Sequence, residues 1–362
     1  MEIKEYKCPN CDGVVKFDSS SQKMKCPYCD TEFEIESLIE YQKEIAAPQK
    51  DHINVDTSKA ATAWEGEELA DLSTGNCPSC GAELIGDKNT IATICPCCGN
   101  TQIVQQRVRG LLKPEYVIPF QLDKKAAVEA LKQFYSGKRL LPNLFKEENH
   151  VNNIQGLYVP FWLFDAKSHG HVTYKATKTS SWSDSNYNYS KTDYYRVLRE
   201  GRLAFEKIPV DGSEKMNNDY MEAIEPFDYS KLKGFLTAYL SGYIAEKYDI
   251  DIEASKGRAA GRMKKSLEYK FAQSVQGYSS VRAERSSVNV EDGKVSYSLL
   301  PVWILNTKYK DENYQFIMNG QSGLLAGKLP IDKGKVSKYR LMFTAGFGIA
   351  STLIIQLLRI FL

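Results

Sequence analysis

The stretch that decides the fold is Cys77-Pro78-Ser79-Cys80, which is followed fourteen residues later by Cys95-Pro96-Cys97-Cys98. The same phrase occurs earlier as Cys8-Pro9-Asn10-Cys11 and Cys26-Pro27-Tyr28-Cys29, again with fourteen residues between the two pairs. Two cysteines separated by two residues can turn their sulfurs toward one point, and two such knuckles place four thiolates around one zinc ion. The spacing therefore predicts two zinc ribbons.

The expected metal ligands are four cysteines in each ribbon. They are Cys8, Cys11, Cys26 and Cys29 in the first ribbon, and Cys77, Cys80, Cys95 and Cys98 in the second. Four thiolates leave no open position for a water molecule, so we expect two structural Zn²⁺ ions and no catalytic metal. Disulfides or free thiols are the alternative interpretation. All nine cysteines precede residue 99, and such a chain without a disulfide framework suits a reducing compartment.

Cys97 is the ninth cysteine, and it takes the place that Tyr28 has in the first ribbon. We expect Cys97 to be an exposed residue that does not bind the metal. A ligand set in which Cys97 replaces Cys98 remains open at this point.

The distribution of charge argues against the usual role of zinc ribbons in nucleic-acid binding. The net charge of the chain is +2, but residues 1–110 contain 11 Lys and Arg against 18 Asp and Glu, a net charge of −7. Proteins that grip nucleic acid usually carry a basic face, because neutralising phosphates supplies the affinity. The acidic N-terminal part therefore favours protein partners.

The C-terminus contains eighteen residues without a charge, from Leu341 to Leu358. A helix of the last 22 residues would be about 33 Å long, enough to cross the apolar part of a bilayer. The basic residues at 333–340 precede it and would keep the bulk of the chain on the cytoplasmic side. We therefore expect a transmembrane helix at 339–362 and a tail-anchored, single-pass protein of the bacterial cell membrane. The alternative is a hydrophobic helix buried in the core.

The expected organisation has five parts. They are zinc ribbon 1 at 1–37, a partly helical linker at 38–72, zinc ribbon 2 at 73–106, a mixed α+β domain at 107–332 and the membrane helix at 339–362. The fold class is thus α+β, with two small metal modules at one end.

Periodicity places the elements of the α+β domain. We expect a strand at 116–120, then a helix at 126–134 with Asp123 as its N-cap and Gly137 at its end. Apolar residues three and four apart predict a second helix at 229–247. Strands are expected at 158–174 and 194–205, where aromatic and β-branched residues are frequent.

Two hydrophobic segments of this domain are similar to each other. In residues 157–167 and 298–308, Pro160 corresponds to Pro301 and Trp162 to Trp303. The similarity predicts an internal strand repeat and a pseudo-symmetric domain. A chance match between two buried strands is the alternative.

The polar segment 180–195 contains Trp182, Tyr187 and Tyr189, which we expect to be exposed. The segment is either the tip of a long hairpin or a contact site for a partner.

The sequence shows no convincing catalytic site. His169 and His171 share one face of an expected strand, but no acidic residue or cysteine nearby completes a metal site, so they are expected to be surface histidines. Asp211-Gly212-Ser213 is typical of a turn. The chain has no phosphate-binding loop, since the glycines at 323–327 are too close together. We therefore expect a protein that is not an enzyme.

The chain resembles a bacterial family of membrane-associated zinc-ribbon proteins of the transcription-factor-IIB type. The motifs that carry the resemblance are the second ribbon followed by Lys113-Pro-Glu-Tyr-Val-Ile-Pro-Phe120, Tyr158-Val-Pro-Phe-Trp162, Val210-Asp-Gly-Ser213, Glu225-Pro-Phe-Asp-Tyr229, Tyr239-Leu-Ser-Gly-Tyr243 and Leu300-Pro-Val-Trp303. Similar proteins are encoded with phage-shock-protein-A (ESCRT-III-like) membrane-stress proteins, and some are labelled replication-restart helicases. The chain lacks the phosphate loop and the length of such a helicase.

The sequence thus predicts a non-enzymatic, tail-anchored zinc-ribbon scaffold that docks protein partners at the cytoplasmic face of the membrane. The resemblance implies a role in membrane-stress response, with a phage-shock-protein-A-like protein or other membrane subunits as partners. A nucleic-acid-binding zinc-ribbon protein of replication or transcription is the alternative.

Overall fold

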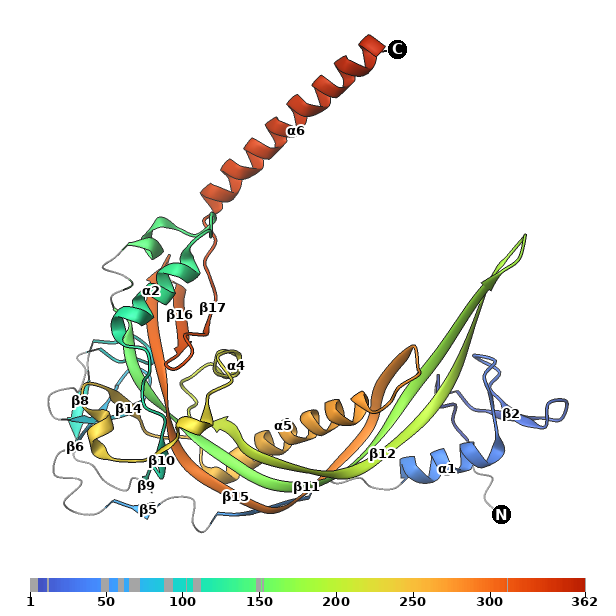
Figure 1. Ribbon diagram of the computed structural model, residues 1–362, viewed down its shortest axis with the longest axis horizontal. Helices are drawn as coiled ribbons and strands as arrows, with labels where there is room; N and C mark the ends of the chain where they lie inside the picture. The colour runs from blue at the N-terminus through green and yellow to red at the C-terminus, as the bar shows by residue number, and fades with distance from the viewer. Residues whose placement is uncertain are drawn as a thin grey trace. The chain divides into compact units, whose positions relative to one another are not determined.

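The fold was analysed in a computed structural model of the whole chain (Figure 1). The residues that the structure describes are 6–11, 13–46, 52–57, 62–64, 72–87, 94–101, 103–106, 112–147, 151, 153–310 and 312–361. The apolar residues 91–94 of the second ribbon, a run typical of a short strand, lie outside them except for Ile94.

The helices are as follows: α1 Ile35–Ala46, α2 Lys124–Tyr135, α4 Asn218–Ala223, α5 Ile252–Gln273 and α6 Lys333–Phe361, with short 3₁₀ turns at Asn143–Lys146, Tyr229–Lys231 and Thr237–Leu240. The strands are β1 Lys16–Asp18, β2 Lys23–Lys25, β3 Glu32–Phe33, β4 His52–Asp56, β5 Thr62–Ala63, β6 Leu72–Asn76, β7 Glu83–Asp87, β8 Val104–Gln106, β9 Leu112–Lys113, β10 Tyr116–Val117, β11 Gln155–Ser183, β12 Asn188–Asp211, β13 Lys233–Gly234, β14 Ile244–Glu246, β15 Ser280–Tyr309, β16 Glu312–Asn319 and β17 Leu325–Gly327. The protein is therefore rich in strands.

The chain forms two compact units. Unit 1 consists of Met1–His52, Gly170–Glu200 and Phe271–Asn289, and unit 2 consists of Ile53–His169, Gly201–Lys270 and Val290–Leu362. Because β11, β12 and β15 are long, each of them contributes residues to both units.

Unit 1 contains the first cysteine ribbon and the parts of the long strands β11, β12 and β15 that belong to this unit. The ribbon is a small antiparallel sheet in the order β1-β2-β3, followed directly by α1. Its core is small: Cys8, Val15, Cys26 and Leu38 are buried together. A core of this size buries little apolar surface, so additional cross-links are needed to hold such a ribbon folded.

Unit 2 is built on a large mixed sheet. Along the main path the described strands follow the order β13-β10-β15-β11-β14-β7-β6-β8, and β12, β16, β17 and β4 are attached to it. The strands β6, β7 and β8 belong to the second cysteine ribbon, and β14 joins them to the sheet through the antiparallel pair Ala245 and Ile85. The second ribbon is thus continuous with the sheet of the larger unit.

The amphipathic helix α2 covers part of this sheet. Asp123 is its N-cap and accepts a hydrogen bond of 2.7 Å from the amide of Ala126, as expected from the sequence. Leu131 and Tyr135 of α2 pack with Trp303 of β15 and Phe316 of β16 in one buried cluster. The helix therefore fixes the end of the β15–β16 hairpin.

The two similar segments of β11 and β15 make corresponding contacts. The indole nitrogen of Trp162 donates to the carbonyl of Ile250 at 2.9 Å, and that of Trp303 donates to the carbonyl of Leu122 at 3.0 Å. Each acceptor directly precedes the aspartate that caps a helix, Asp251 before α5 and Asp123 before α2. Each tryptophan therefore ties its strand to the start of a helix.

Two glycines complete this correspondence. The amide of Gly212 donates to the carbonyl of Pro160 at 2.8 Å, and the amide of Gly320 donates to that of Pro301 at 2.9 Å. The carbonyl of Gly212 accepts from the amide of Ile250, as that of Gly320 accepts from Leu122. The two halves of unit 2 thus share one local design of strand, glycine turn and capped helix.

The helix expected at 229–247 is wrong. This segment contains two 3₁₀ turns and the short strands β13 and β14. Gly234 pairs with Tyr116 of β10, and Gly242 has a φ of +78°, a left-handed conformation that ends any helix there. The apolar side chains at helical spacing do not share one buried face, since Leu240 is buried and Leu236 is exposed.

The long helix of this region is α5, which is not among the elements expected from the sequence. Most of its residues are charged or small, and its buried side chains include Ala259, Ala260, Met263 and Leu267. A face of small residues gives only a weak apolar periodicity, which explains why the sequence did not reveal it.

The C-terminal segment also requires a correction. It is helical, as α6, but within the part of the chain that the structure describes no helix is long and apolar enough to cross a membrane. Thr344, Ser351, Thr352 and Gln356 interrupt its apolar side chains, and four Lys and Arg occupy its start. The membrane-spanning helix expected at 339–362 is therefore wrong, as are the tail-anchored, single-pass membrane localisation and the membrane as a partner through this helix.

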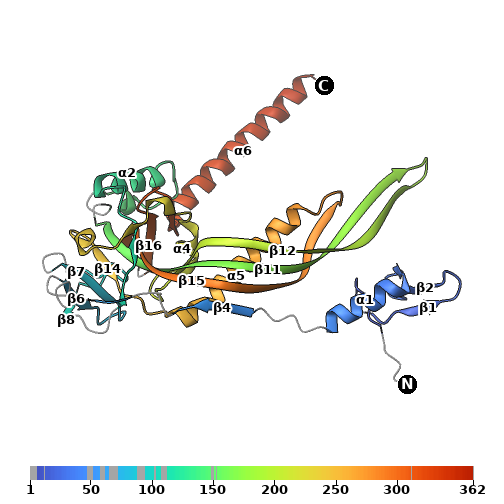
Figure 2. The same cartoon turned by 60° about the horizontal axis from the view of Figure 1, so that its bottom comes forward.

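The segment 180–195 is the end of the hairpin that joins β11 and β12, two strands that run side by side in Figure 2. Trp182, Tyr187 and Tyr189 are exposed, as expected. Trp182 and Tyr189 are stacked, with ring centroids 5.5 Å apart. The aromatic side chains of the tip thus form an ordered cluster.

Candidate metal centres

The structure brings the first four expected ligands together. The Sγ atoms of Cys8 and Cys29 are 3.6 Å apart, and those of Cys11 and Cys26 are 3.5 Å apart. All four sulfurs lie within 4.8 Å of one another. Two tight turns present them, since the amide of Cys8 donates to the carbonyl of Gly13 and the amide of Cys26 to that of Thr31.

The second group has the same construction. The Sγ atoms of Cys77 and Cys98 are 3.6 Å apart, and those of Cys80 and Cys95 are 3.8 Å apart, with all four again within 4.8 Å. In each knuckle the residue after the second cysteine is a glycine in the left-handed conformation, Gly81 with φ +75° and Gly99 with φ +78°. A glycine adopts this conformation without the steric cost of a side chain.

Both groups fit a zinc ion. Four thiolates bound at about 2.3 Å in a tetrahedron lie about 3.8 Å from one another, close to the sulfur separations given above. Thiolates are soft ligands, which zinc accepts readily and which hard cations such as Mg²⁺ do not. Each group of four cysteines could therefore hold one metal ion, and a closed set of sulfur ligands gives it a structural role.

The pKa values of the thiols differ within each group. In the first group, burial raises the pKa of Cys8 to about 12, while the hydroxyl and amide of Thr31 lower the pKa of Cys29 to about 6. In the second, burial raises the pKa of Cys80, and a hydrogen bond from Cys97 lowers that of Cys95 to about 5. A metal ion must displace the protons of the high-pKa thiols, so metal affinity is expected to fall as the pH falls.

The second group is part of the core of unit 2. Cys77, Cys95 and Cys97 are buried in the same cluster as Leu157 and Val159 of β11. The group's second knuckle is also held from outside, because Asn306 of β15 donates to the carbonyl of Pro96 and Gln315 of β16 donates to that of Cys97. The position of this metal group is thus fixed by strands more than 200 residues away in the sequence.

Cys97 is buried, with 6% of its surface exposed, so the expectation of an exposed residue is wrong. Its sulfur lies 3.7 Å from a carboxyl oxygen of Glu246, whereas the sulfur of Cys98 lies with the other three of the group. Glu246 also accepts a hydrogen bond of 2.8 Å from the hydroxyl of Ser213. The structure therefore separates the two adjacent cysteines, and Cys98 is the one placed to bind a metal.

Glu246 is a glutamate in a fully buried position, which is uncommon for this residue type. Only 1% of its surface is exposed, and burial raises the pKa of its carboxyl to about 8. A carboxyl with a raised pKa keeps its proton more readily at neutral pH, which lowers the cost of burying it beside the thiolates.

The remaining candidates do not form a site. His169 and His171 lie half-buried on β11, and neither belongs to a metal-compatible group among the described residues. The turn Asp211-Gly212-Ser213 is buried and structural. Asp211 forms an ion pair of 2.7 Å with Arg258 of α5, and Ser213 bonds to Glu246 as described above.

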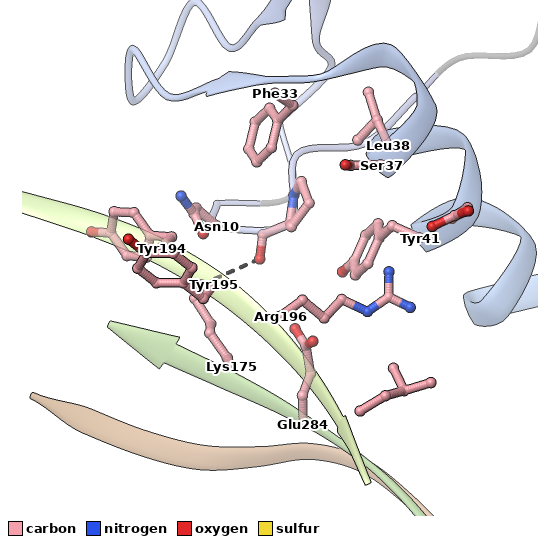
Figure 3. Close-up of a pocket in the computed structure, with 13 residues that line it drawn as sticks. Asn10, Phe33, Ser37, Leu38, Tyr41, Lys175, Tyr194, Tyr195, Arg196 and Glu284 are labelled. Carbon is pink, nitrogen blue, oxygen red and sulfur yellow. Dashed lines mark hydrogen bonds between the residues drawn. The ribbon is translucent and has the colours of Figure 1, made fainter. Parts of the chain in front are cut away.

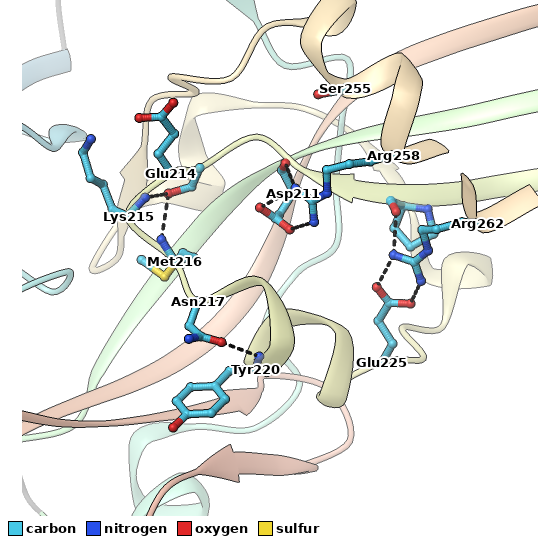
Figure 4. A network of polar contacts seen from close by, with 12 residues as sticks. Asp211, Glu214, Lys215, Met216, Asn217, Tyr220, Glu225, Ser255, Arg258 and Arg262 are labelled. Atoms are coloured by element: carbon cyan, nitrogen blue, oxygen red, sulfur yellow. Dashed lines mark hydrogen bonds and ion pairs between the residues drawn. The ribbon is translucent and has the colours of Figure 1, made fainter. Parts of the chain in front are cut away.

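A second, partly buried ion pair lies near the first, between Glu225 and Arg262 (Figure 4). Arg262 also donates to the carbonyl of Pro209 at 2.8 Å. Neither ion pair could be predicted from the sequence, because its two members are far apart in the chain. The arginines on the polar face of α5 do not form a recognisable sequence motif. These contacts fasten α5 to the end of β12 and to the segment that follows α4.

Comparison with known proteins identifies the family of the chain. No protein-family model matches the chain, and no solved structure matches it either. An uncharacterized protein of Bacillus subtilis (strain 168), YdjG, is 34% identical over 337 residues, which cover 93% of both proteins. Of the resemblance noted in the sequence, the structure bears out the two clusters of four cysteines. A match of this extent shows that the chain belongs to the same family as YdjG of Bacillus subtilis.

Proposed function

We propose that the protein is a non-enzymatic zinc-ribbon scaffold that docks protein partners. The observation that carries the proposal is the pair of closed four-cysteine groups, each with sulfur spacings that match one zinc ion. A closed thiolate set stabilises a fold and leaves no position for a substrate or an activated water. The metal ions then keep the two ribbons folded, so that the ribbons can present their surfaces to a partner.

The hairpin tip of unit 1 supports a docking role. Trp182, Tyr187 and Tyr189 are exposed, and the hydroxyl of Tyr189 donates to Asp184 at 2.9 Å, so the aromatic cluster is pre-organised. Tryptophan and tyrosine dominate the binding energy of protein interfaces, because they bury a large area with few rotatable bonds. An ordered, exposed aromatic cluster suits a protein partner.

The experiment is affinity purification of the full-length protein from its native cells after crosslinking. Trp182→Ala combined with Tyr189→Ala is the test variant, and Tyr269→Ala is the control because Tyr269 is an exposed aromatic residue on α5, outside the tip. We expect the control to retain the partners and the tip variant to lose them. Equal recovery from both variants would exclude the tip as the docking site.

A parallel assay addresses nucleic acid. Fluorescence anisotropy with labelled single- and double-stranded DNA and RNA should show no binding at physiological salt, given the net charge of −7 in residues 1–110. Tight binding that weakens steeply with salt would contradict a purely protein-docking scaffold.

A further inference from the structure

The two cysteine groups differ in how far solvent can reach their sulfurs. In the first group, Cys11 and Cys29 are exposed. In the second group, the corresponding Cys80 and Cys98 are only partly accessible and pack against the hydrophobic core of unit 2. A chelating molecule can therefore approach two ligands of the first group directly, whereas protein covers the second group.

The two groups also differ in their support. The first ribbon has a three-stranded sheet of its own, with strands of three, three and two residues. The second ribbon shares the large sheet, and the Asn306 and Gln315 contacts hold its second knuckle. Exposure of the second group thus requires disruption of the unit 2 core, whereas the first group needs only local opening.

A cavity of about 430 Å³ lies beside the first group, entirely within unit 1 (Figure 3). Pro9 and Asn10, which lie between the ligands Cys8 and Cys11, form part of its wall. The backbone amide of Asn10 lies 3.4 Å from the sulfur of Cys8. This wall of the cavity is therefore made by the metal-binding turn itself.

Most of the rest of the lining comes from α1 and from the strands β11 and β12. Lys175 of β11 donates to the carbonyl of Pro9 at 3.3 Å, and the guanidinium of Arg196 lies 5.0 Å from the ring centre of Tyr41. Leu38 lines the cavity and is buried against Cys8 and Cys26. The contacts that close the cavity thus depend on the fold of the first ribbon.

We propose that the first group is an exchangeable zinc site and the second a permanent one, and that loss of zinc from the first group opens the cavity in unit 1. The inference rests on the proposed function in one respect, that both groups bind zinc. A competing ligand takes over the zinc ion from Cys11 and Cys29, whose sulfurs face solvent. The knuckle that contains Pro9 and Asn10 then loses its cross-link, and the contacts with Lys175 and Arg196 open.

The test follows zinc release from the full-length protein. Protein with two zinc equivalents is mixed with excess 4-(2-pyridylazo)resorcinol, and absorbance of the zinc–dye complex is recorded. We expect two phases of one equivalent each, the first faster by at least about tenfold because it needs only local opening. Peptide-resolved hydrogen exchange after the first phase should show lost protection at residues 6–46 and 194–198, and unchanged protection at residues 72–106.

Variants assign the phases. Cys11→Ser and Cys29→Ser should each abolish the fast phase. Cys80→Ser, the matched change in the second group, should leave the fast phase in place. If Cys80→Ser fails to fold, the hydrogen-exchange pattern of the unaltered protein still assigns the fast phase. Release of both equivalents in a single phase, or a fast phase that maps to residues 72–106, would overturn the inference. Protein that takes up fewer than two zinc equivalents after reconstitution with excess zinc under reducing conditions would instead contradict the proposed function.

Discussion

At the scale of single residues, Cys97 and Cys98 show how neighbours in sequence acquire different roles. The turn of the knuckle directs the sulfur of Cys98 toward the other three sulfurs, while that of Cys97 lies beside Glu246 in the core. Spacing alone could not separate them, because both cysteines are close to the position that a ligand needs.

This difference predicts the outcome of two adjacent substitutions. Cys98→Ala should remove one metal equivalent from the purified protein, because three thiolates leave the site open to water and chelators. Cys97→Ala should retain both equivalents and lower the free energy of unfolding only moderately, by about 1 kcal/mol for a small buried side chain. Metal analysis by inductively coupled plasma mass spectrometry distinguishes the two variants, and loss of metal on Cys97→Ala alone would show that the ligand set is wrong.

Glu246 predicts a dependence of stability on pH. Its carboxyl has a pKa of about 8 in the folded protein, against an ordinary value of 4.5. The folded state therefore keeps a proton that the unfolded chain releases between these two values. The contribution to the free energy of unfolding is fully present below pH 4.5, and it is lost as the pH rises toward 8.

Glu246→Gln should remove this dependence, because a glutamine keeps the hydrogen bond from Ser213 without ionising. Relative to the unaltered protein, the variant should gain stability as the pH is raised from 6 to 9, by on the order of a few kcal/mol. Urea unfolding of both proteins at the two pH values measures the difference. A difference that stays constant with pH would show that the carboxyl is not protonated in the fold.

At the scale of elements, the two glycine turns of unit 2 should respond differently to the same substitution. A Cβ on Gly320 would lie 2.8 Å from Phe120 and 2.9 Å from the backbone oxygen of Pro301, whereas on Gly212 its nearest neighbours would be 3.3 Å away. We expect Gly320→Ala to cost about 1 to 3 kcal/mol through overpacking, and Gly212→Ala to cost clearly less. Thermal unfolding of both variants measures this, and equal losses would contradict the stated packing.

The elements also show what the sequence could and could not predict. The cap Asp123 and helix α2 were predictable, since capping and an apolar stripe are local signals. The mistaken helix at 229–247 arose because Leu232, Leu236 and Leu240 recur at helical spacing, although glycines and pairing with β10 prevent a continuous α-helix. Helix α5 was not predicted because its buried face consists mostly of small residues, which give a weak apolar periodicity. The ion pairs that hold its polar face join it to Asp211 and Glu225, which are distant in sequence.

At the scale of the whole molecule, the cysteine spacing predicted two similar groups but not their different surroundings. The first group stands on a small sheet of its own, and the second is built into the sheet of unit 2. That difference depends on contacts from β14, β15 and β16, which no local pattern encodes. The C-terminal helix was misread for the opposite reason, since a long run without charges was given more weight than the polar residues within it.

Each cysteine group is expected to hold one zinc ion. The decisive measurement is the metal content of the full-length protein, purified under reducing conditions without added metal, by inductively coupled plasma mass spectrometry. We predict two zinc equivalents per chain, and about one after Cys8→Ser or Cys77→Ser. Protein that is folded by circular dichroism but contains no zinc, or contains iron in its place, would show that the cysteine groups are not zinc sites.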